Sequence, residues 1–387
     1  MQRSVAVLSG ATVATAVVIA VMVHHRRRRG QSKVPQPPRS IPTFDLSDFL
    51  HTGQVDLSLC KEMAHCLRDA GIVVIRDPRV TADEATAFTE LMQRYYSQEK
   101  SELMKDARPE CAYQVGVTPE NIECAKCAKD PKCLQTIDQM PAEHRPHKPT
   151  SPDPKWRFFW RIGPRPAKSA FPEQNLEPVV PAAFPEWRET MDAWGAKMLA
   201  ALETTTELLA IGLGLERSSL RELMRNGPHL LAPTGSNLER YDQIGTIFAG
   251  WHTDLNFLTI HGKSNFPGLY VWLRDGKKMA VKVPSGCLLI QAGQQMEYVT
   301  GGYVKAGFHE VVVDDGTRAA AESARRQGKS LWRISSTMFG TVRSDATLEP
   351  FERFRSEPTA SKYPPLPAGQ QVLNELMAIG MADDLKK

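Results

Sequence analysis

Apolar side chains recur along this chain at two different spacings. Over residues 185–226 they return every three to four positions, a period typical of a helix that packs one face on a core. The members of that stripe are Trp187, Met191, Trp194, Met198 and Leu202. Over residues 237–343, short apolar runs rich in β-branched and aromatic residues alternate with Gly and Pro, which predicts strands. We therefore expect an α+β fold with a mainly β core.

Three of the predicted strands carry polar side chains that form a pattern. His252 and Asp254 lie two residues apart in the strand-like segment 250–260, so both side chains point to one face. His309 lies in a second such segment, 306–313, and Arg333 and Ser335 lie two apart in a third. His261 follows His252 by nine residues, falls on the opposite face of an unbroken strand, and is interpreted as structural.

The residue types give this pattern a chemical meaning. Two imidazoles and one carboxylate on one face of an octahedron hold Fe(II) and leave three positions open, which assigns His252, Asp254 and His309 as metal ligands. A guanidinium and a hydroxyl on one face can bind a carboxylate, which assigns Arg333 and Ser335 to the far end of a dicarboxylate such as 2-oxoglutarate. Taken singly, an H-x-D pair is weak evidence, and an isolated strand arginine is more often part of a surface ion pair.

In this order the motifs resemble the Fe(II)/2-oxoglutarate-dependent dioxygenases, in the branch that includes isopenicillin N synthase and the plant hormone and flavonoid oxygenases. The resemblance is carried by His252-Thr253-Asp254, His309, Arg333-Ile334-Ser335 and residues 41–47, 70–75, 266–271 and 283–293. It implies a distorted double-stranded β-helix, or jelly-roll, barrel flanked by helices. It also implies that Tyr241 helps to hold the far carboxylate of 2-oxoglutarate.

The activity implied by the resemblance uses Fe(II), O2 and 2-oxoglutarate, releases succinate and CO2, and hydroxylates a small organic substrate. Desaturation, cyclisation and protein hydroxylation remain open. So do two other classes, a 2-oxoglutarate-independent iron oxidase of the same fold and a catalytically silent membrane-anchored scaffold. Segment 155–161 is dense in aromatic and basic residues, and we interpret Arg157, Phe159 and Arg161 as candidates for the substrate pocket.

Residues 5–23 carry no charge, and four arginines follow at 26–29. This length and flank predict an N-terminal transmembrane helix. By the positive-inside rule the catalytic domain faces the cytosol, in a single-pass protein of the endoplasmic reticulum or the mitochondrial outer membrane. Residues 1–39 hold seven Lys or Arg and no acid, which leaves 41 basic and 44 acidic side chains elsewhere. The basic balance is therefore no argument for nucleic acid binding.

These segments suggest the following organisation of the chain: a membrane anchor with basic flank (1–30), a linker (31–40), an N-terminal dioxygenase region (41–180) with a Cys-containing insertion (108–150), bracing helices (181–230), the iron and 2-oxoglutarate core (231–345) and a C-terminal segment (346–387). Residues 314–330 exceed the usual short turn before Arg333, and we expect a loop insertion with a short helix over 317–326.

The insertion holds Cys111, Cys124, Cys127 and Cys133. These four residues could bind zinc, although only Cys124 and Cys127 have a regular spacing. Free thiols or a redox pair are the preferred interpretation in a reducing compartment. With the opposite membrane topology, disulfides would be expected.

Overall fold

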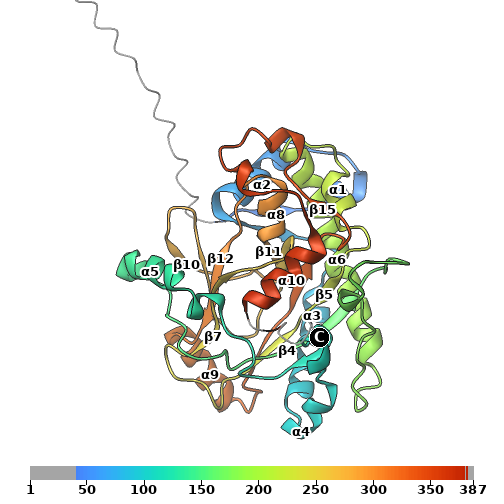
Figure 1. Cartoon of the computed structure of the whole chain (residues 1–387). Helices are drawn as coiled ribbons and strands as arrows, with labels where there is room; N and C mark the ends of the chain where they lie inside the picture. Colours follow the sequence, from blue (N-terminus) through green and yellow to red (C-terminus); the bar gives the residue numbers. More distant parts are fainter. Residues whose placement is uncertain (1–40, 380, 382–387) are drawn as a thin grey trace, which may run out of the picture. The chain divides into compact units, whose positions relative to one another are not determined.

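The computed structural model of the protein describes residues 41–379 and 381, and two β-sheets form its core (Figure 1). The larger sheet runs in the order β1 (Thr43–Asp45), β2 (Ile72–Arg76), β11 (Cys287–Ala292), β8 (Leu258–His261), β14 (Thr337–Gly340), β5 (His229–Leu231), β4 (Trp156–Ile162), β6 (Thr234–Asn237) and β13 (Trp332–Ser335), with β3 (Gly116–Thr118) on β4. Only the β1/β2 pair in it is parallel.

The smaller sheet is antiparallel and runs in the order β10 (Lys278–Ala280), β9 (Leu269–Trp272), β12 (Phe308–Val312) and β7 (Ile247–Thr253). Together the two sheets form the expected double-stranded β-helix. β13 and β14 are separated by Ser336 alone, yet β13 pairs with β6 while β14 pairs with β8 and β5. The segment from β13 to β14 therefore pairs with two different parts of the larger sheet. A separate two-stranded antiparallel sheet consists of β15 (Thr347–Leu348) and β16 (Leu366–Pro367).

Long helices pack beside the larger sheet. The predicted apolar stripe lies on α6 (Trp187–Gly212), and all five of its members are buried. α6 packs mainly on α2 (Leu57–Ala70) and also contacts α3 (Ala82–Tyr96), β4, β8 and β14. α3 begins at a capping box, in which the side chains of Thr81 and Glu84 each accept a hydrogen bond from the other residue's backbone N–H. The remaining helices are α1 (Ser47–Thr52), α4 (Lys100–Leu103), α5 (Pro131–Gln139), α7 (Ser219–Met224), α8 (Gln294–Val299), α9 (Asp315–Arg326) and α10 (Ala368–Ala378).

The surplus residues between His309 and Arg333 form the short helix that the sequence predicts. α9 is N-capped by Asp314, whose side chain accepts a hydrogen bond from the Thr317 backbone N–H. Its Ala321 and Ala324 are buried in a cluster with Phe248 and Leu331. The insertion leaves the register of the barrel intact, because Arg333 still pairs with Ser236 on β6.

The prediction of a transmembrane helix has to be corrected. Across the described residues no helix combines the length and the apolar character needed to cross a membrane. α6 is 26 residues long but carries charged side chains, among them Arg188, Asp192, Lys197 and Glu203. The predicted span, residues 5–23, lies outside the described residues. On this finding the predicted membrane anchor is wrong, and so is the cytosol-facing membrane localisation that rested on it.

Candidate active site

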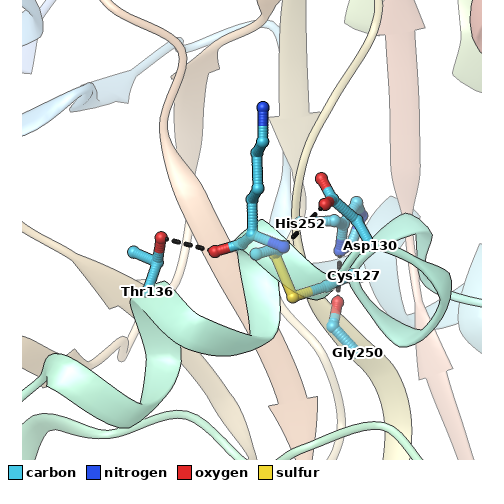
Figure 2. The surroundings of a disulfide bond; sticks show 7 residues. Cys127, Asp130, Thr136, Gly250 and His252 are labelled. Carbon is cyan, nitrogen blue, oxygen red and sulfur yellow. Dashed lines mark hydrogen bonds between the residues drawn. A yellow bond between two sulfur atoms is a disulfide. The ribbon is translucent and has the colours of Figure 1, made fainter.

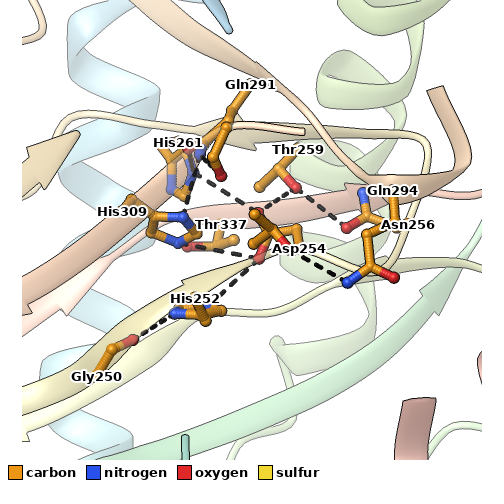
Figure 3. A network of polar contacts seen from close by, with 12 residues as sticks. Gly250, His252, Asp254, Asn256, Thr259, His261, Gln291, Gln294, His309 and Thr337 are labelled. Carbon is orange, nitrogen blue, oxygen red and sulfur yellow. Dashed lines mark hydrogen bonds and ion pairs between the residues drawn. The ribbon is translucent and has the colours of Figure 1, made fainter. Parts of the chain in front are cut away.

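The three predicted metal ligands meet where β7 ends. His252 is the penultimate residue of β7, Asp254 follows that strand directly, and His309 lies on β12 in register with His252. The distance from Asp254 Oδ1 is 3.6 Å to His252 Nε2 and 3.9 Å to His309 Nε2. Figure 3 shows the three side chains pointing toward one another. One atom from each lies within 4.8 Å of the others, so a single ion could contact all three.

Hydrogen bonds to neighbouring groups orient these side chains. His252 Nδ1 lies 2.6 Å from the Gly250 carbonyl oxygen, so Nδ1 carries the proton and Nε2 keeps its lone pair for a metal. Thr259 donates a hydrogen bond of 2.6 Å to Asp254 Oδ2, which leaves Oδ1 to face the two histidines. The sequence analysis did not identify Thr259, which is one of many threonines on predicted strands and has no motif of its own.

The charges of the site favour a bound cation. Burial alone raises the pKa of the Asp254 carboxyl, but His309 and His252 outweigh burial and hold that pKa well below its usual range. Burial and His252 hold the pKa of His309 well below its usual range. The site therefore presents an ionised carboxylate and a neutral imidazole with a free lone pair, which are the protonation states that metal binding requires.

His261 also reaches this site, contrary to the interpretation that it lies on the opposite face. Residues 254–257 form a break between β7 and β8, and this break resets the alternation of side chains on which the interpretation rested. The His261 ring lies 5.1 Å from that of His309, and its Nε2 is 3.0 Å from Gln291 Oε1. Gln291 in turn contacts His309 Nδ1 at 3.1 Å. His261 and Gln291 thus form a second layer behind the candidate ligands (Figure 3).

Arg333 and Ser335 lie on β13 and line the same cavity as the three candidate ligands. Arg333 is buried, and Nε donates to the Pro267 carbonyl oxygen at 3.0 Å. Within the part of the chain that the structure describes, no carboxylate lies within ion-pair distance of this guanidinium. Burial lowers the pKa of Arg333 to about 10, so it remains a cation at neutral pH. A buried cation without an acidic partner is costly, and a bound anion would compensate it.

Tyr241 lies apart from this group. Its hydroxyl is 3.2 Å from Glu120 Oε2, its ring lies beneath the Arg240 guanidinium, and it does not line the cavity. The described contacts therefore give it no place beside Arg333.

The cavity measures about 950 Å³ and extends from Arg333 past the histidines to β4. Of the three predicted pocket residues, Arg157 and Phe159 line it. Arg161 lies two residues further along β4, beyond the cavity, where its guanidinium binds the carbonyl oxygens of Ile162 and Pro164. β4 continues past the end of the cavity, so the density of aromatic and basic residues in segment 155–161 was not sufficient to place Arg161.

The Cys-containing insertion covers one side of the cavity. Cys124, Cys127 and Cys133 all line it. The insertion contacts β7 so closely that a Cβ added at Gly250 would lie 2.7 Å from the Ala125 Cβ. Figure 2 shows the bond between Cys127 and Cys133 beside Gly250 and His252.

That disulfide contradicts the suggested zinc site. Cys127 and Cys133 are bonded to each other, with Cα atoms 5.2 Å apart, while Cys111 and Cys124 are free. Two of the four sulfur atoms are therefore unavailable as thiolate ligands. The bonded cysteines are not Cys124 and Cys127, the two with a regular spacing. The turn that leads into α5 brings Cys133 back to Cys127 instead.

Comparisons with known proteins point to one superfamily. Residues 235–341 match the family described as the 2OG-Fe(II) oxygenase superfamily. Jasmonate-induced oxygenase 4 of Arabidopsis thaliana is 25% identical over 191 residues, which are 48% of this chain and 49% of that protein. Flavonol synthase/flavanone 3-hydroxylase of Petunia hybrida is 29% identical over 139 residues, 35% of this chain and 39% of that protein. The chain thus spans about half or less of the length of these relatives.

Solved structures show the same fold over a longer stretch. A putative 2OG-Fe(II) oxygenase family protein from Caulobacter crescentus has a TM-score of 0.69 at 19% identity, covering 88% of this chain and 99% of that one. A full-length protein of Neurospora crassa, solved in complex with alpha-KG, has a TM-score of 0.67 at 17% identity, covering 87% and 96%. Fe(II) and 2-oxoglutarate are the cofactors of this superfamily. The barrel, the cavity and the sequence match agree, and the chain contains a 2OG-Fe(II) oxygenase superfamily domain over residues 235–341.

Proposed function

We propose that this protein is a non-haem Fe(II)- and 2-oxoglutarate-dependent dioxygenase that hydroxylates a small organic substrate and releases succinate and CO2. One observation carries the proposal: a His, Asp and His cluster and a buried arginine, which has no acidic partner among the described residues, open into one cavity. The solved structure of JOX2 in complex with 2OG, Fe and JA, which has a TM-score of 0.63 to this chain, supports a barrel of this kind holding a metal, the co-substrate and a small molecule together.

The side chains have separate roles in this proposal. His252, Asp254 and His309 hold the iron, and Thr259 and the Gly250 carbonyl keep two of these ligands oriented. Arg333 and Ser335 bind the far carboxylate of 2-oxoglutarate. When bound, Fe(II) and 2-oxoglutarate activate O2 for insertion of one oxygen atom into a C–H bond of the substrate.

The balance of charge fits this co-substrate. Fe(II) bound by the single carboxylate Asp254 carries a net charge of one positive unit, and Arg333 supplies another. 2-Oxoglutarate is a dianion at neutral pH, so it neutralises both in a buried site where an uncompensated charge is costly.

The test is an anaerobic titration of 2-oxoglutarate into the Fe(II)-loaded full chain, monitored by the visible metal-to-ligand charge-transfer absorption. We expect a saturable band that disappears in His252→Ala. His65→Ala, which removes an exposed histidine on α2, should leave the band unchanged. Bound iron without a band would contradict the assignment of 2-oxoglutarate and favour the oxidase alternative. Failure of the wild-type protein to bind iron would contradict the metal site itself.

A further inference from the structure

Four charged side chains, three of them buried and one partly buried, form the wall of the cavity on the β4 side. They are connected in the order Asp153, Lys155, Glu123, Arg157, and we call them the charged quartet. Lys155 Nζ lies 2.5 Å from Asp153 Oδ2 and 3.1 Å from Glu123 Oε2, and Arg157 pairs with the other oxygen of Glu123. All four line the cavity. None of them takes part in the proposed binding of iron or 2-oxoglutarate.

The quartet alternates in sign, so its two carboxylates and two cations cancel. Arg157 and Lys155 outweigh the effect of burial and lower the pKa of Glu123, while the two carboxylates outweigh burial and raise the pKa of Lys155. Burial raises the pKa of Asp153, an effect that its contact with Lys155 opposes. The four charges of the quartet therefore pair with one another, whereas Asp153 Oδ1 and Arg157 Nε have no hydrogen-bond partner in the described part of the chain.

Arg157 ends the quartet and is its most open member, with 16% of its side chain exposed. Its guanidinium lies over the Phe159 ring, 4.3 Å from the ring centre. Phe159 in turn meets Phe339 edge to face at 6.2 Å. The wall therefore offers a hydrogen-bond donor beside two aromatic rings, all facing the space next to the candidate metal ligands.

From this arrangement we infer that the substrate is an uncharged polar molecule with a carbonyl-type oxygen that accepts a hydrogen bond from Arg157 and a carbon skeleton that packs on Phe159 and Phe339. The inference rests on the proposed function. The net charge is zero for the set formed by iron, Asp254, Arg333 and 2-oxoglutarate. The net charge of the quartet is also zero. A carboxylate on the substrate would add an uncompensated charge to a buried site. Six other charged residues line the cavity, and they do not alter this balance. Lys126, Lys132, Lys263 and Lys282 are exposed, so water screens them. Glu375 pairs with Lys126, and Asp130 caps the start of α5.

The experiment compares amides with carboxylates of the same shape. Binding of benzamide and benzoate, nicotinamide and nicotinate, and cinnamamide and cinnamate to the Fe(II)- and 2-oxoglutarate-loaded full chain is measured by anaerobic calorimetry. We expect the amides to bind about tenfold or more tightly than their carboxylates, and Arg157→Met to weaken amide binding about tenfold, as for loss of a hydrogen bond to a charged donor.

Arg157→Met leaves Glu123 without one of its partners and could fail to fold. The double variant Glu123→Gln/Arg157→Met keeps the remaining pair of Lys155 and Asp153 neutral and should show the same loss of amide binding. The matched control is Arg188→Met, because Arg188 also lies over an aromatic ring of β4, that of Trp160, but outside the cavity. This control should bind the amides as the wild type does.

Tighter binding of the carboxylates would overturn the inference, and so would amides that bind no better to the wild type than to the double variant. The charge-transfer band of 2-oxoglutarate is recorded on the same samples. If that band is absent, the proposed function fails and the inference falls with it. If the band is present without a preference for amides, the inference alone fails.

Discussion

His252 and His309 face each other across one pair of antiparallel strands, in register, with ring centres 4.2 Å apart. The backbone hydrogen bonds between β7 and β12 therefore set the spacing of these two candidate ligands, rather than the conformation of a flexible loop. Asp254, the third, is fixed from behind by Thr259 on β8. Both sheets of the barrel thus contribute to one site before any ion binds.

Replacing Thr259 by valine should weaken iron binding. The substitution removes the 2.6 Å hydrogen bond to Asp254 Oδ2 and leaves the carboxylate free to rotate. Losses of roughly 10- to 100-fold in metal affinity are typical when such a partner is removed. Competition with a chromophoric chelator measures the affinity. Thr86→Val on the exposed face of α3 is the control, and equal affinity of Thr259→Val and wild type would show that Asp254 needs no such partner.

Replacing Arg333 by methionine should weaken 2-oxoglutarate binding by about 2–3 kcal/mol, or roughly 100-fold, because the far carboxylate loses a buried charged partner. The dependence of the charge-transfer band on 2-oxoglutarate concentration measures this. 2-Oxobutanoate lacks the far carboxylate, so it should bind equally to Arg333→Met and to the wild type. If the variant lost affinity for both acids to the same extent, Arg333 would act on the structure of the site and not on the carboxylate.

Replacing Tyr241 by phenylalanine should leave the 2-oxoglutarate titration unchanged. The hydroxyl that is removed contacts Glu120, and Tyr241 does not line the cavity. Arg333→Met serves as the positive control in the same assay. A tenfold loss of 2-oxoglutarate affinity in Tyr241→Phe would instead support the role that the family resemblance implied.

His229 should make the protein less stable in acid. Burial, together with Arg161, lowers its pKa from 6.5 to about 3, and its Nδ1 accepts a hydrogen bond from the Thr341 backbone N–H at 3.1 Å. Between pH 6.5 and 3 the unfolded chain takes up a proton at this residue and the folded protein does not. The free energy of unfolding therefore falls as the pH is lowered from 6.5 to 3, by about 1.4 kcal/mol per pH unit. Above pH 6.5 His229 is neutral in both states and adds no pH dependence.

Urea unfolding of the wild type and His229→Gln at pH 7.5 and pH 5 tests this effect. The free energy of unfolding should fall further in the wild type than in the variant over this interval. His65→Gln removes an exposed histidine and should behave as the wild type does. An equal pH dependence in all three proteins would contradict the prediction.

Removing the disulfide should destabilise the insertion. Bonding Cys127 to Cys133 restricts the unfolded chain, and for a loop of this length the loss is about 2 kcal/mol. Urea unfolding with and without dithiothreitol measures it. The wild type should lose stability on reduction, Cys127→Ser/Cys133→Ser should be insensitive to it, and Cys124→Ser, which changes a free thiol, should follow the wild type. A wild type unaffected by reductant would contradict the prediction.

Local periodicity predicted much of this fold. The stripe from Trp187 to Leu202 predicted α6, and the rule that alternate strand residues share a face predicted that Arg333 and Ser335 line one cavity. These inferences needed only neighbours within one element. The barrel came from the family resemblance, because pairing between distant strands leaves no local pattern in the sequence.

Other parts of the site depend on relationships that periodicity does not contain. His261 reaches the cavity because a break after Asp254 resets the strand alternation. Glu123 and Asp153 form ion pairs with Lys155. Both acidic residues lie in irregular segments, where no helical or strand periodicity predicts the direction of a side chain. The disulfide depends on the turn into α5. In each case the decisive contact is set by an irregular turn.

The helix α9 has a practical consequence for studying this protein. It is held against the barrel by Ala321 and Ala324, whereas the turn after it contains Gly328, which has a φ of +63° and no neighbouring atom within 4 Å of an added Cβ. A short epitope or a fluorescent peptide inserted after Gly328 would extend into solvent between the strands that carry His309 and Arg333. Such a label would allow ligand binding to be followed by a reporter in the middle of the chain, with both termini left native.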